Sequence, residues 1–402
     1  MPKDDINYKF TENGIVYDFY DVFVPAENFR QPTLFVWGNS NRGQLGINDT
    51  TGSNIPVTTF SGGTNWKQLS CGKNHTAAIK TDGSLWIWGH NITGQLGNNL
   101  SGGGVSETQN RSTPITTFAG GNNWKQVACA EYHTSAIKTD GSLWSWGLNQ
   151  FGMLGTNDTA NRSAPVTTFA GGNDWKSVAC GDIHVLAIKT DGSLWVWGRG
   201  ADGQLGTNNT QDIRTPVTTF AGGTNWKSIA GGVQHSAAVK TDGTLWTWGT
   251  NDFAQLGINN TANRSAPVTT FAGGNDWKSV ACGRSHTIAI KTDGTLWTWG
   301  RGDDGQLGNN NTANQTTPVT TFTGGTNWKS AAGGGNFTSS HTSAIKTDGS
   351  LWVWGKAANG QLGINNSASR STPVTTFAGG NNWKQVSCGI LHTAAIKYSP
   401  DP

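Results

Sequence analysis

A five-residue pattern, Leu-Trp-x-Trp-Gly, recurs along this 402-residue chain and constrains its fold more than any other feature. It occurs six times in full, and a seventh copy, at Leu34, has Phe in place of the first Trp. The steps between the closing glycines are 51, 58, 51, 51, 51 and 55 residues, for Gly38, Gly89, Gly147, Gly198, Gly249, Gly300 and Gly355. A period of this length, built from strand-forming residues, is typical of a propeller or a solenoid.

Each period predicts four short strands, which we name A to D in chain order. In one repeat they are expected at residues 66–71, 75–80, 85–89 and 114–118. Asp-Gly between B and C, first at Asp82, is a strong hairpin signal because the tight turn needs positive φ at both central residues. A Gly-Gly-x-x-Trp turn joins D to the next A.

The chain has seven C strands but only six Asp-Gly turns, and the missing turn marks where its two ends meet. It enters at a C strand (34–38) and a D strand (56–60), and it leaves at an A strand (383–388) and a B strand (392–397). We therefore expect an all-β, seven-bladed β-propeller of four-stranded antiparallel blades. Two N-terminal and two C-terminal strands share one blade, so that no sheet edge stays unpaired.

A longer pattern surrounds each Trp-Gly. Gly-Gln-Leu-Gly follows it, first at Gly43, then Pro-Val, and then Cys-Gly-x-x-His-Thr-x-Ala-Ile-Lys-Thr-Asp-Gly. This pattern resembles the repeat of the regulator of chromosome condensation family, over the whole stretch from Leu34 to Lys397. The resemblance implies a seven-bladed propeller, which agrees with the strand count. It does not by itself imply a function, because such repeats serve many unrelated roles.

The composition bears on partners and location. Only 13% of residues are charged and the net charge is +3, without blocks of like charge, which argues against nucleic acid or an anionic membrane as a partner. No apolar run is long enough for a signal peptide or for membrane insertion. We expect synthesis in a reducing cytoplasm.

Cysteine, histidine and tryptophan recur at fixed repeat positions, which favours structural roles. The cysteines share one place on separate inner strands and are expected to be buried thiols, not disulfides. Seven histidines begin the B strands, too far apart for a metal site, and are expected to bond backbone of their own or the adjacent blade. Trp-x-Trp pairs suit packing between blades. The cysteines are Cys71, Cys129, Cys180, Cys282 and Cys388, and the histidines are His75, His133, His184, His235, His286, His341 and His392.

Signatures of catalysis are missing from the sequence. Asparagine-rich loops such as that at Asn48 lack the alternating acids and the closing glutamate of a calcium loop, and they are interpreted as turns. There is no nucleophile elbow, phosphate loop or zinc spacing. We expect no catalytic residue, no metal and no cofactor, and a protein that is not an enzyme.

Variation between the repeats falls on one face of the predicted disc, where the A–B and C–D connections emerge. Both insertions lie there, at 100–109 in a C–D loop and at 334–340 in an A–B loop. Loops on a rigid scaffold commonly carry recognition, although unconstrained drift is the alternative. The candidate binding residues are Arg42, Lys73, Asn74, His90, Glu131, Tyr132, Phe151, Asp182, Asp202, Gln234, Phe253, Arg284, Asp304, Phe337 and Leu391.

Residues 1–33 stand outside the repeats, the propeller is assigned to 34–398, and 399–402 form a tail. The first segment is rich in aromatic residues and includes one strand-like run, 15–24. It either covers a propeller edge or docks on a partner protein. Its candidate docking residues are Tyr17, Phe19, Tyr20 and Phe23.

These observations predict a non-enzymatic structural or recognition propeller that binds a protein or glycan through the A–B/C–D face. A short non-repeat head before nearly identical repeats resembles propellers of bacteriophage virions, so the first hypothesis is a virion component, as decoration, fibre or host-recognition protein. One alternative is guanine-nucleotide exchange on a small GTPase, the activity of the family's founding member. That activity uses a loop wedge that neither insertion clearly matches. Another is a bacterial cytoplasmic scaffold.

Overall fold

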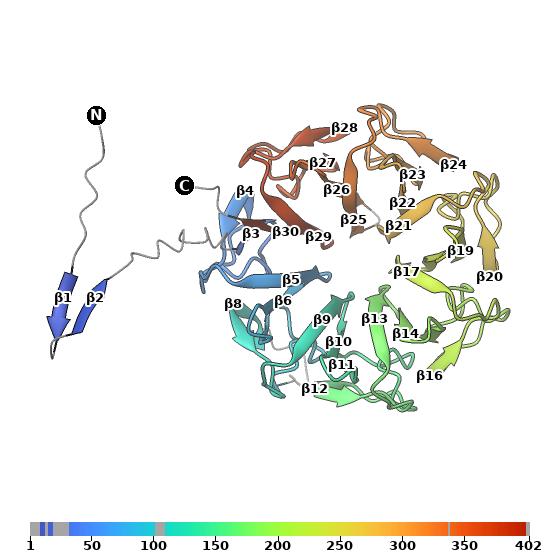
Figure 1. Ribbon diagram of the computed structural model, residues 1–402. Helices are drawn as coiled ribbons and strands as arrows, with labels where there is room; N and C mark the ends of the chain where they lie inside the picture. Colours follow the sequence, from blue (N-terminus) through green and yellow to red (C-terminus); the bar gives the residue numbers. More distant parts are fainter. Residues whose placement is uncertain (1–8, 13–14, 19–31, 101–108, 337, 399–402) are drawn as a thin grey trace.

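The computed structural model describes residues 9–12, 15–18, 32–100, 109–336 and 338–398. Seven four-stranded antiparallel sheets form a closed ring around a central channel (Figure 1). The predicted seven-bladed β-propeller is therefore confirmed. Within the described ranges, no helix is long and apolar enough to cross a membrane.

Blades are numbered here from 1 at residue 66 to 7 at residue 383, with the A strand innermost (Figure 1). The A strands are β5 Trp66–Cys71, β9 Trp124–Cys129, β13 Trp175–Cys180, β17 Trp226–Gly231, β21 Trp277–Cys282, β25 Trp328–Asn336 and β29 Trp383–Cys388. The B strands are β6 His75–Lys80, β10 His133–Lys138, β14 His184–Lys189, β18 His235–Lys240, β22 His286–Lys291, β26 Ser339–Lys346 and β30 His392–Tyr398.

The two outer strands of each blade follow in the same order. The C strands are β7 Leu85–Gly89, β11 Leu143–Gly147, β15 Leu194–Gly198, β19 Leu245–Gly249, β23 Leu296–Gly300, β27 Leu351–Gly355 and β3 Pro32–Gly38. The D strands are β8 Arg111–Thr116, β12 Arg162–Thr167, β16 Ile213–Thr218, β20 Arg264–Thr269, β24 Gln315–Thr320, β28 Arg370–Thr375 and β4 Ser53–Thr58.

The prediction for the D strands was shifted along the chain. They were expected at 56–60 and 114–118, whereas β4 and β8 begin three residues earlier and end two residues earlier. Proline has no backbone N–H to donate. It is tolerated inside this outermost strand because the outer edge has no neighbouring strand that needs such a donor. The strand ends before Phe118 because the Phe118 N–H donates to the Gly97 carbonyl at 2.8 Å instead of continuing the ladder.

The ring closes in blade 7, as predicted. Its strand order is β29-β30-β3-β4, so the C-terminal half of the blade pairs with the N-terminal half. Seven residue pairs join β3 to β30, from Pro32 with Tyr398 to Gly38 with His392. The closing strand thus begins two residues before position 34.

Two segments outside the regular repeat differ from expectation. The insertion at 334–340 was predicted as a loop, but β25 and β26 continue pairing through it as far as Asn336 with Ser339, which makes a longer hairpin. At the N-terminus, β1 Lys9–Glu12 pairs with β2 Ile15–Asp18 as a two-stranded sheet. The expected strand over 15–24 is therefore seen only as far as Asp18, and 19–24 lie outside the described residues.

The core lies between adjacent blades. One cluster joins Leu34 and Leu45 of blade 7 to Trp66 and Trp88 of blade 1, and these two indoles meet edge to face with centroids 6.3 Å apart. The first Trp of each Trp-x-Trp pair is only half-buried, and in blade 1 Lys80 lies over its ring. The packing role is thus confirmed for the buried second Trp, while the first packs at the edge of the cluster and also supports a lysine.

Candidate recognition face

The repeat histidines form a structural network beneath the variable face. The Thr76 hydroxyl donates to the Gln44 carbonyl at 2.8 Å, and the Trp88 indole donates to the same oxygen at 3.0 Å. Because that hydroxyl proton is used, His392 Nε2, 2.9 Å from Thr76 Oγ1, must be the donor. Burial lowers the pKa of all seven imidazoles to about 3, so they are neutral. Six bond a hydroxyl of the adjacent blade, not the backbone that was expected.

The glutamine of Gly-Gln-Leu-Gly fixes the variable residue in front of it. The Gln44 Oε1 atom accepts the backbone N–H of Arg42 at 2.8 Å. The same bond holds the equivalent position in five other loops, namely Thr93, Asp202, Phe253, Asp304 and Asn359. In six of the seven loops the variable residue two positions before this glutamine is therefore held by the same bond, whereas Phe151 precedes Met153 and lacks it.

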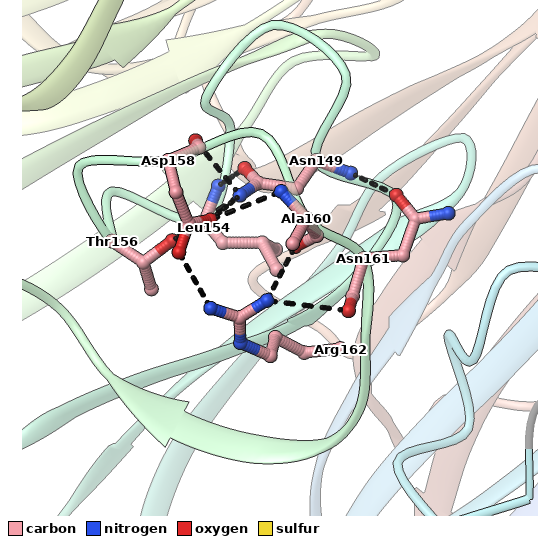
Figure 2. Close-up of polar contacts among 7 residues, drawn as sticks. All are labelled: Asn149, Leu154, Thr156, Asp158, Ala160, Asn161 and Arg162. Carbon is pink, nitrogen blue, oxygen red and sulfur yellow. Dashed lines mark hydrogen bonds and ion pairs between the residues drawn. The ribbon is translucent and has the colours of Figure 1, made fainter.

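The C–D loop of blade 2 shows how the asparagines brace these loops (Figure 2). Asn149 donates to the Asp158 backbone oxygen at 3.0 Å and accepts the Leu154 N–H at 2.9 Å. The Asp158 carboxylate pairs with Arg162 at 2.6 Å and accepts the Ala160 N–H at 3.1 Å. Its oxygens are thus engaged within the loop, which supports the interpretation as a turn over that of a calcium loop.

Five candidate residues come together across three blades. Lys73 forms an ion pair with Glu131 of the next blade, donates to the Tyr132 hydroxyl at 3.0 Å and lies 4.8 Å from the centre of its ring. The His90 and Tyr132 rings are 6.2 Å apart. Together with Arg42, His90 and Tyr132 border a pocket of about 450 Å³. The pocket is also lined by Ile92, Thr93, Leu148 and Gln150. We call this the Tyr132 pocket.

Charged groups also meet at the mouth of the central channel, whose volume is about 310 Å³. Lys73, Asp182 and Arg284 line it. Burial raises the pKa of Asp182 to about 7, and the negative charge of Glu131 adds to the effect, while Arg284 and Lys73 oppose it. Asp182 therefore changes charge near neutral pH.

The remaining candidates pair between neighbouring loops. Gln234 donates to Asp202 at 2.9 Å, and Arg199 lies between Asp202 at 3.7 Å and the Phe151 ring at 5.3 Å. In the following blades Arg301 lies over Phe253, and Asp304 pairs with Lys356 and accepts the Ser340 N–H. Most of the variable residues thus contact a variable residue of a neighbouring loop.

The sequence matches known repeats over nearly the whole ring. The regulator of chromosome condensation (RCC1) repeat matches seven times, at residues 33–79, 82–137, 140–188, 191–239, 242–290, 293–340 and 348–396. The chain belongs to the RCC1 repeat family.

Several members of the RCC1 repeat family are similar to this chain. The ultraviolet-B receptor UVR8 of Arabidopsis thaliana is 34% identical over 335 residues, covering 82% of this chain and 74% of the receptor. The X-linked retinitis pigmentosa GTPase regulator homolog of Caenorhabditis elegans is 30% identical, covering 74% of this chain and 24% of that protein. The structure of Prp20p from Saccharomyces cerevisiae, which binds Gsp1p and histones, shares the fold with a TM-score of 0.79 at 20% identity, covering 93% of each chain. These eukaryotic relatives do not support the bacterial or bacteriophage subtype.

Reasoning from single repeats missed the RCC1 loop residues that complete these clusters. Ile92, Leu148 and Gln150 line the Tyr132 pocket, and Arg199 and Arg301 bridge neighbouring loops. The available signal was the first residue after Trp-Gly, which differs between all but two repeats: Asn39, His90, Leu148, Arg199, Thr250, Arg301 and Lys356.

Seven candidates lie outside these clusters or outside the described residues. Asn74 accepts a weak bond from Gln44 at 3.5 Å, and the Leu391 carbonyl accepts the Asn39 N–H at 2.8 Å. Tyr17 lies in β2, without a described side chain. Phe337 lies outside the described residues, as do Phe19, Tyr20 and Phe23.

Proposed function

We propose that this chain is a non-enzymatic recognition propeller that binds a partner protein through the A–B/C–D face, with the Tyr132 pocket as the main contact. The observation that carries the proposal is the convergence of variable residues from three blades on one pocket. Bonds to Gln44 and Gln95 hold the backbones of Arg42 and Thr93, and Lys73 holds the Tyr132 hydroxyl, so these parts of the pocket are in place before a partner arrives.

The chemistry of the pocket suits a protein partner. It combines cationic Arg42, aromatic Tyr132 and His90, and apolar Ile92 and Leu148. Tyrosine and arginine in a partly enclosed site are enriched among the residues that dominate binding energy in protein interfaces. Binding of Gsp1p and histones by Prp20p supports a protein ligand by analogy.

Site-specific cross-linking tests the proposal. Tyr132 would be replaced by a photoreactive phenylalanine derivative in the full chain, with the exposed Thr139 at the opposite end of the same blade as the matched control. We expect the reagent at position 132 to give a discrete cross-linked product with a partner protein, and the reagent at position 139 to give none. The product from position 132 should disappear when Lys73→Glu is added. Equal products from both positions would overturn the proposal. Glycan binding that depends on Tyr132 would assign the pocket to a glycan.

The longer hairpin of β25 and β26 favours a second candidate, the regulation of a small GTPase. In the described chain, it is the one A–B connection in which the two strands pair beyond the repeat histidine, from Gly334 with His341 to Asn336 with Ser339. Release of a fluorescent guanine nucleotide from a panel of small GTPases would measure this activity. Acceleration that disappears when the hairpin is shortened to the length found in blade 5 would support exchange, and no acceleration would exclude it for that panel.

Two narrower proposals concern location: a bacteriophage virion component, or a bacterial cytoplasmic scaffold. The virion proposal rests on the resemblance of the short head and repeats, and the plant, nematode and yeast relatives give it no support. Mass spectrometry of purified particles against cell lysate distinguishes the two. Deletion of residues 1–31 spares the pairing of Pro32 with Tyr398 and should leave the ring folded. If residues 1–33 are the docking segment, the deletion removes the chain from its particle or assembly.

A further inference from the structure

Seven phenylalanines at one repeat position are exposed on the propeller. Each follows a D strand, and the exposed fraction of each is between 62% and 67%. In the described part of the chain, only Leu100 joins them as an exposed large apolar residue. The seven are Phe60, Phe118, Phe169, Phe220, Phe271, Phe322 and Phe377.

The D–A links that begin at these phenylalanines lie at the face opposite the Tyr132 pocket. The Thr168 N–H, just before Phe169, donates to the Leu143 carbonyl at the start of a C strand. The following link reaches Trp175, whose N–H donates at 3.0 Å to Gly141 in the B–C turn of the preceding blade. The D–A links therefore share a face with the B–C turns. Because the seven phenylalanines hold equivalent positions in a closed ring, a partner that covers this face is presented with all seven.

The same face carries the net positive charge of the propeller. Two lysines per blade lie at this end, the second residue of each A strand and the last repeat lysine of each B strand. These fourteen lysines accompany eight aspartates, which gives +6. The rest of residues 34–402 holds eleven bases and eleven acids, which balance. The charges looked scattered along the sequence because the repeat spaces them, yet the fold gathers them on one face.

The lysines differ in how they are presented. Those in the A strands are exposed, namely Lys67, Lys125, Lys176, Lys227, Lys278, Lys329 and Lys384. Those at the ends of the B strands lie over indole rings, as Lys138 does at 4.4 Å from the centre of Trp144. The turn aspartates are partly engaged by their own turns: Asp140 accepts the Ser142 hydroxyl at 2.6 Å.

We propose that the B–C/D–A face docks peripherally on an anionic lipid bilayer. A face of exposed apolar rings with lysines around them matches the headgroup boundary, where aromatic rings enter the interface and lysines meet anionic headgroups. Seven weak contacts to one surface gain by avidity. The shared positive charge disfavours a second copy on this face, and rings separated by whole blades do not suit continuous stacking along a nucleic acid strand.

Vesicle flotation of the full chain tests this docking at 0.15 M salt. Vesicles would hold phosphatidylcholine alone or with 30% phosphatidylglycerol. We expect binding only to the anionic vesicles, weakened at least tenfold when Phe169, Phe220 and Phe271 become serine, and abolished when Lys176, Lys227 and Lys278 become glutamate. Since these side chains are exposed, thermal unfolding should stay unchanged in both variants.

The matched control carries Arg214→Glu and Arg370→Glu, at the starts of β16 and β28 on the opposite face, and should bind as the parent does. No binding to anionic vesicles would overturn the proposal, and so would binding that the phenylalanine variant leaves intact. Lysine-dependent binding to a DNA oligonucleotide without vesicle binding would assign the face to nucleic acid. Dimers in sedimentation that the phenylalanine variant dissociates, again without vesicle binding, would assign it to self-association.

Discussion

Val185 occupies the position from which a hydroxyl of the neighbouring blade should bind His133. The other six repeat histidines have a Thr or Ser oxygen 2.8 to 3.0 Å from Nε2, whereas no described residue bonds the Nε2 atom of His133. Methionine also replaces glutamine at this junction, although the Met153 carbonyl still accepts the Trp197 indole N–H at 2.8 Å. The junction between blades 2 and 3 therefore contains a buried polar group without its usual partner.

Restoring the hydroxyl should stabilise the ring. Val185→Thr is nearly isosteric, and its Oγ1 can donate to the Met153 carbonyl while accepting from His133. We expect a gain of about 1 kcal/mol in the free energy of unfolding, measured by urea denaturation. The reverse change, Thr287→Val, removes the partner of His235 and should cost about 1–3 kcal/mol. A loss of stability in Val185→Thr would show that the site has adapted to valine.

Ala254 is the second irregular position, because it adopts φ +63° where the equivalent residue in the other repeats is glycine. A Cβ atom at the equivalent Gly203 would lie 2.8 Å from the Ser265 Cα atom. Ala254→Gly should therefore raise the free energy of unfolding by about 0.5–1 kcal/mol, since left-handed strain is relieved at some entropic cost. Gly203→Ala is the control and should lower it. Equal stability of Ala254→Gly and the parent would mean that the backbone absorbs the strain.

Period and turn chemistry were enough to predict the blades. Asp82 and its copies place the hairpins, and the absent seventh copy located the closure between β3 and β30. The inner-strand position of the cysteines predicted buried free thiols: all five are free and Cys71, Cys129 and Cys388 are buried, whereas Cys180 and Cys282 are partly exposed. The hairpins can be derived from one stretch of sequence, and the closure from counting the repeats along the chain. Neither requires knowledge of which blades touch.

Contacts between blades could not be derived in this way. The partner of His75 is Thr134, 59 residues away, and Lys73 meets Glu131 only because adjacent A–B loops touch. The lysines near Phe169 looked scattered in the sequence because each repeat contributes only two of them. The fold places all of these lysines on one face of the ring. Predicting these features requires the register between blades, which no single repeat contains.

The cysteines provide a third prediction. Burial raises the pKa of the Cys71, Cys180 and Cys388 thiols to about 12, so almost no thiolate is present at pH 8. Iodoacetamide should alkylate the native protein about a thousandfold more slowly than an exposed thiol, and five thiols should react after unfolding in guanidinium. Phe169→Cys supplies the exposed reference thiol in the same molecule. Rapid alkylation of Cys71, Cys129 or Cys388 in the native parent protein would contradict their burial, whereas Cys180 and Cys282 are partly exposed and should be the first to react.

Asp182 should make stability depend on pH. Its pKa is about 7 in the folded protein and near 3.8 when unfolded, so between these values the folded state holds a proton that the unfolded state has released. The contribution of Asp182 to stability therefore falls as pH rises from about 4 to 7. Asp182→Asn stays neutral and should gain about 1–2 kcal/mol over the parent at pH 8, allowing for partial exposure, but little at pH 4.

Thermal unfolding at pH 4, 5, 6, 7 and 8 measures this effect as the difference between Asp182→Asn and the parent at each pH. The seven repeat histidines stay neutral in the folded protein, where burial lowers their pKa from 6.5 to about 3, but they bind protons below about pH 6.5 once the chain unfolds. They therefore lower the stability of both proteins alike as the pH falls, and their effect cancels in the difference. Asp140→Asn is the control of opposite sign, since hydrogen bonds from Ser142 lower the pKa of Asp140. It should lower stability by similar amounts at pH 6 and pH 8. The same gain for Asp182→Asn at pH 4 and pH 8 would mean that Asp182 stays charged throughout, and that the channel mouth does not withdraw it from water.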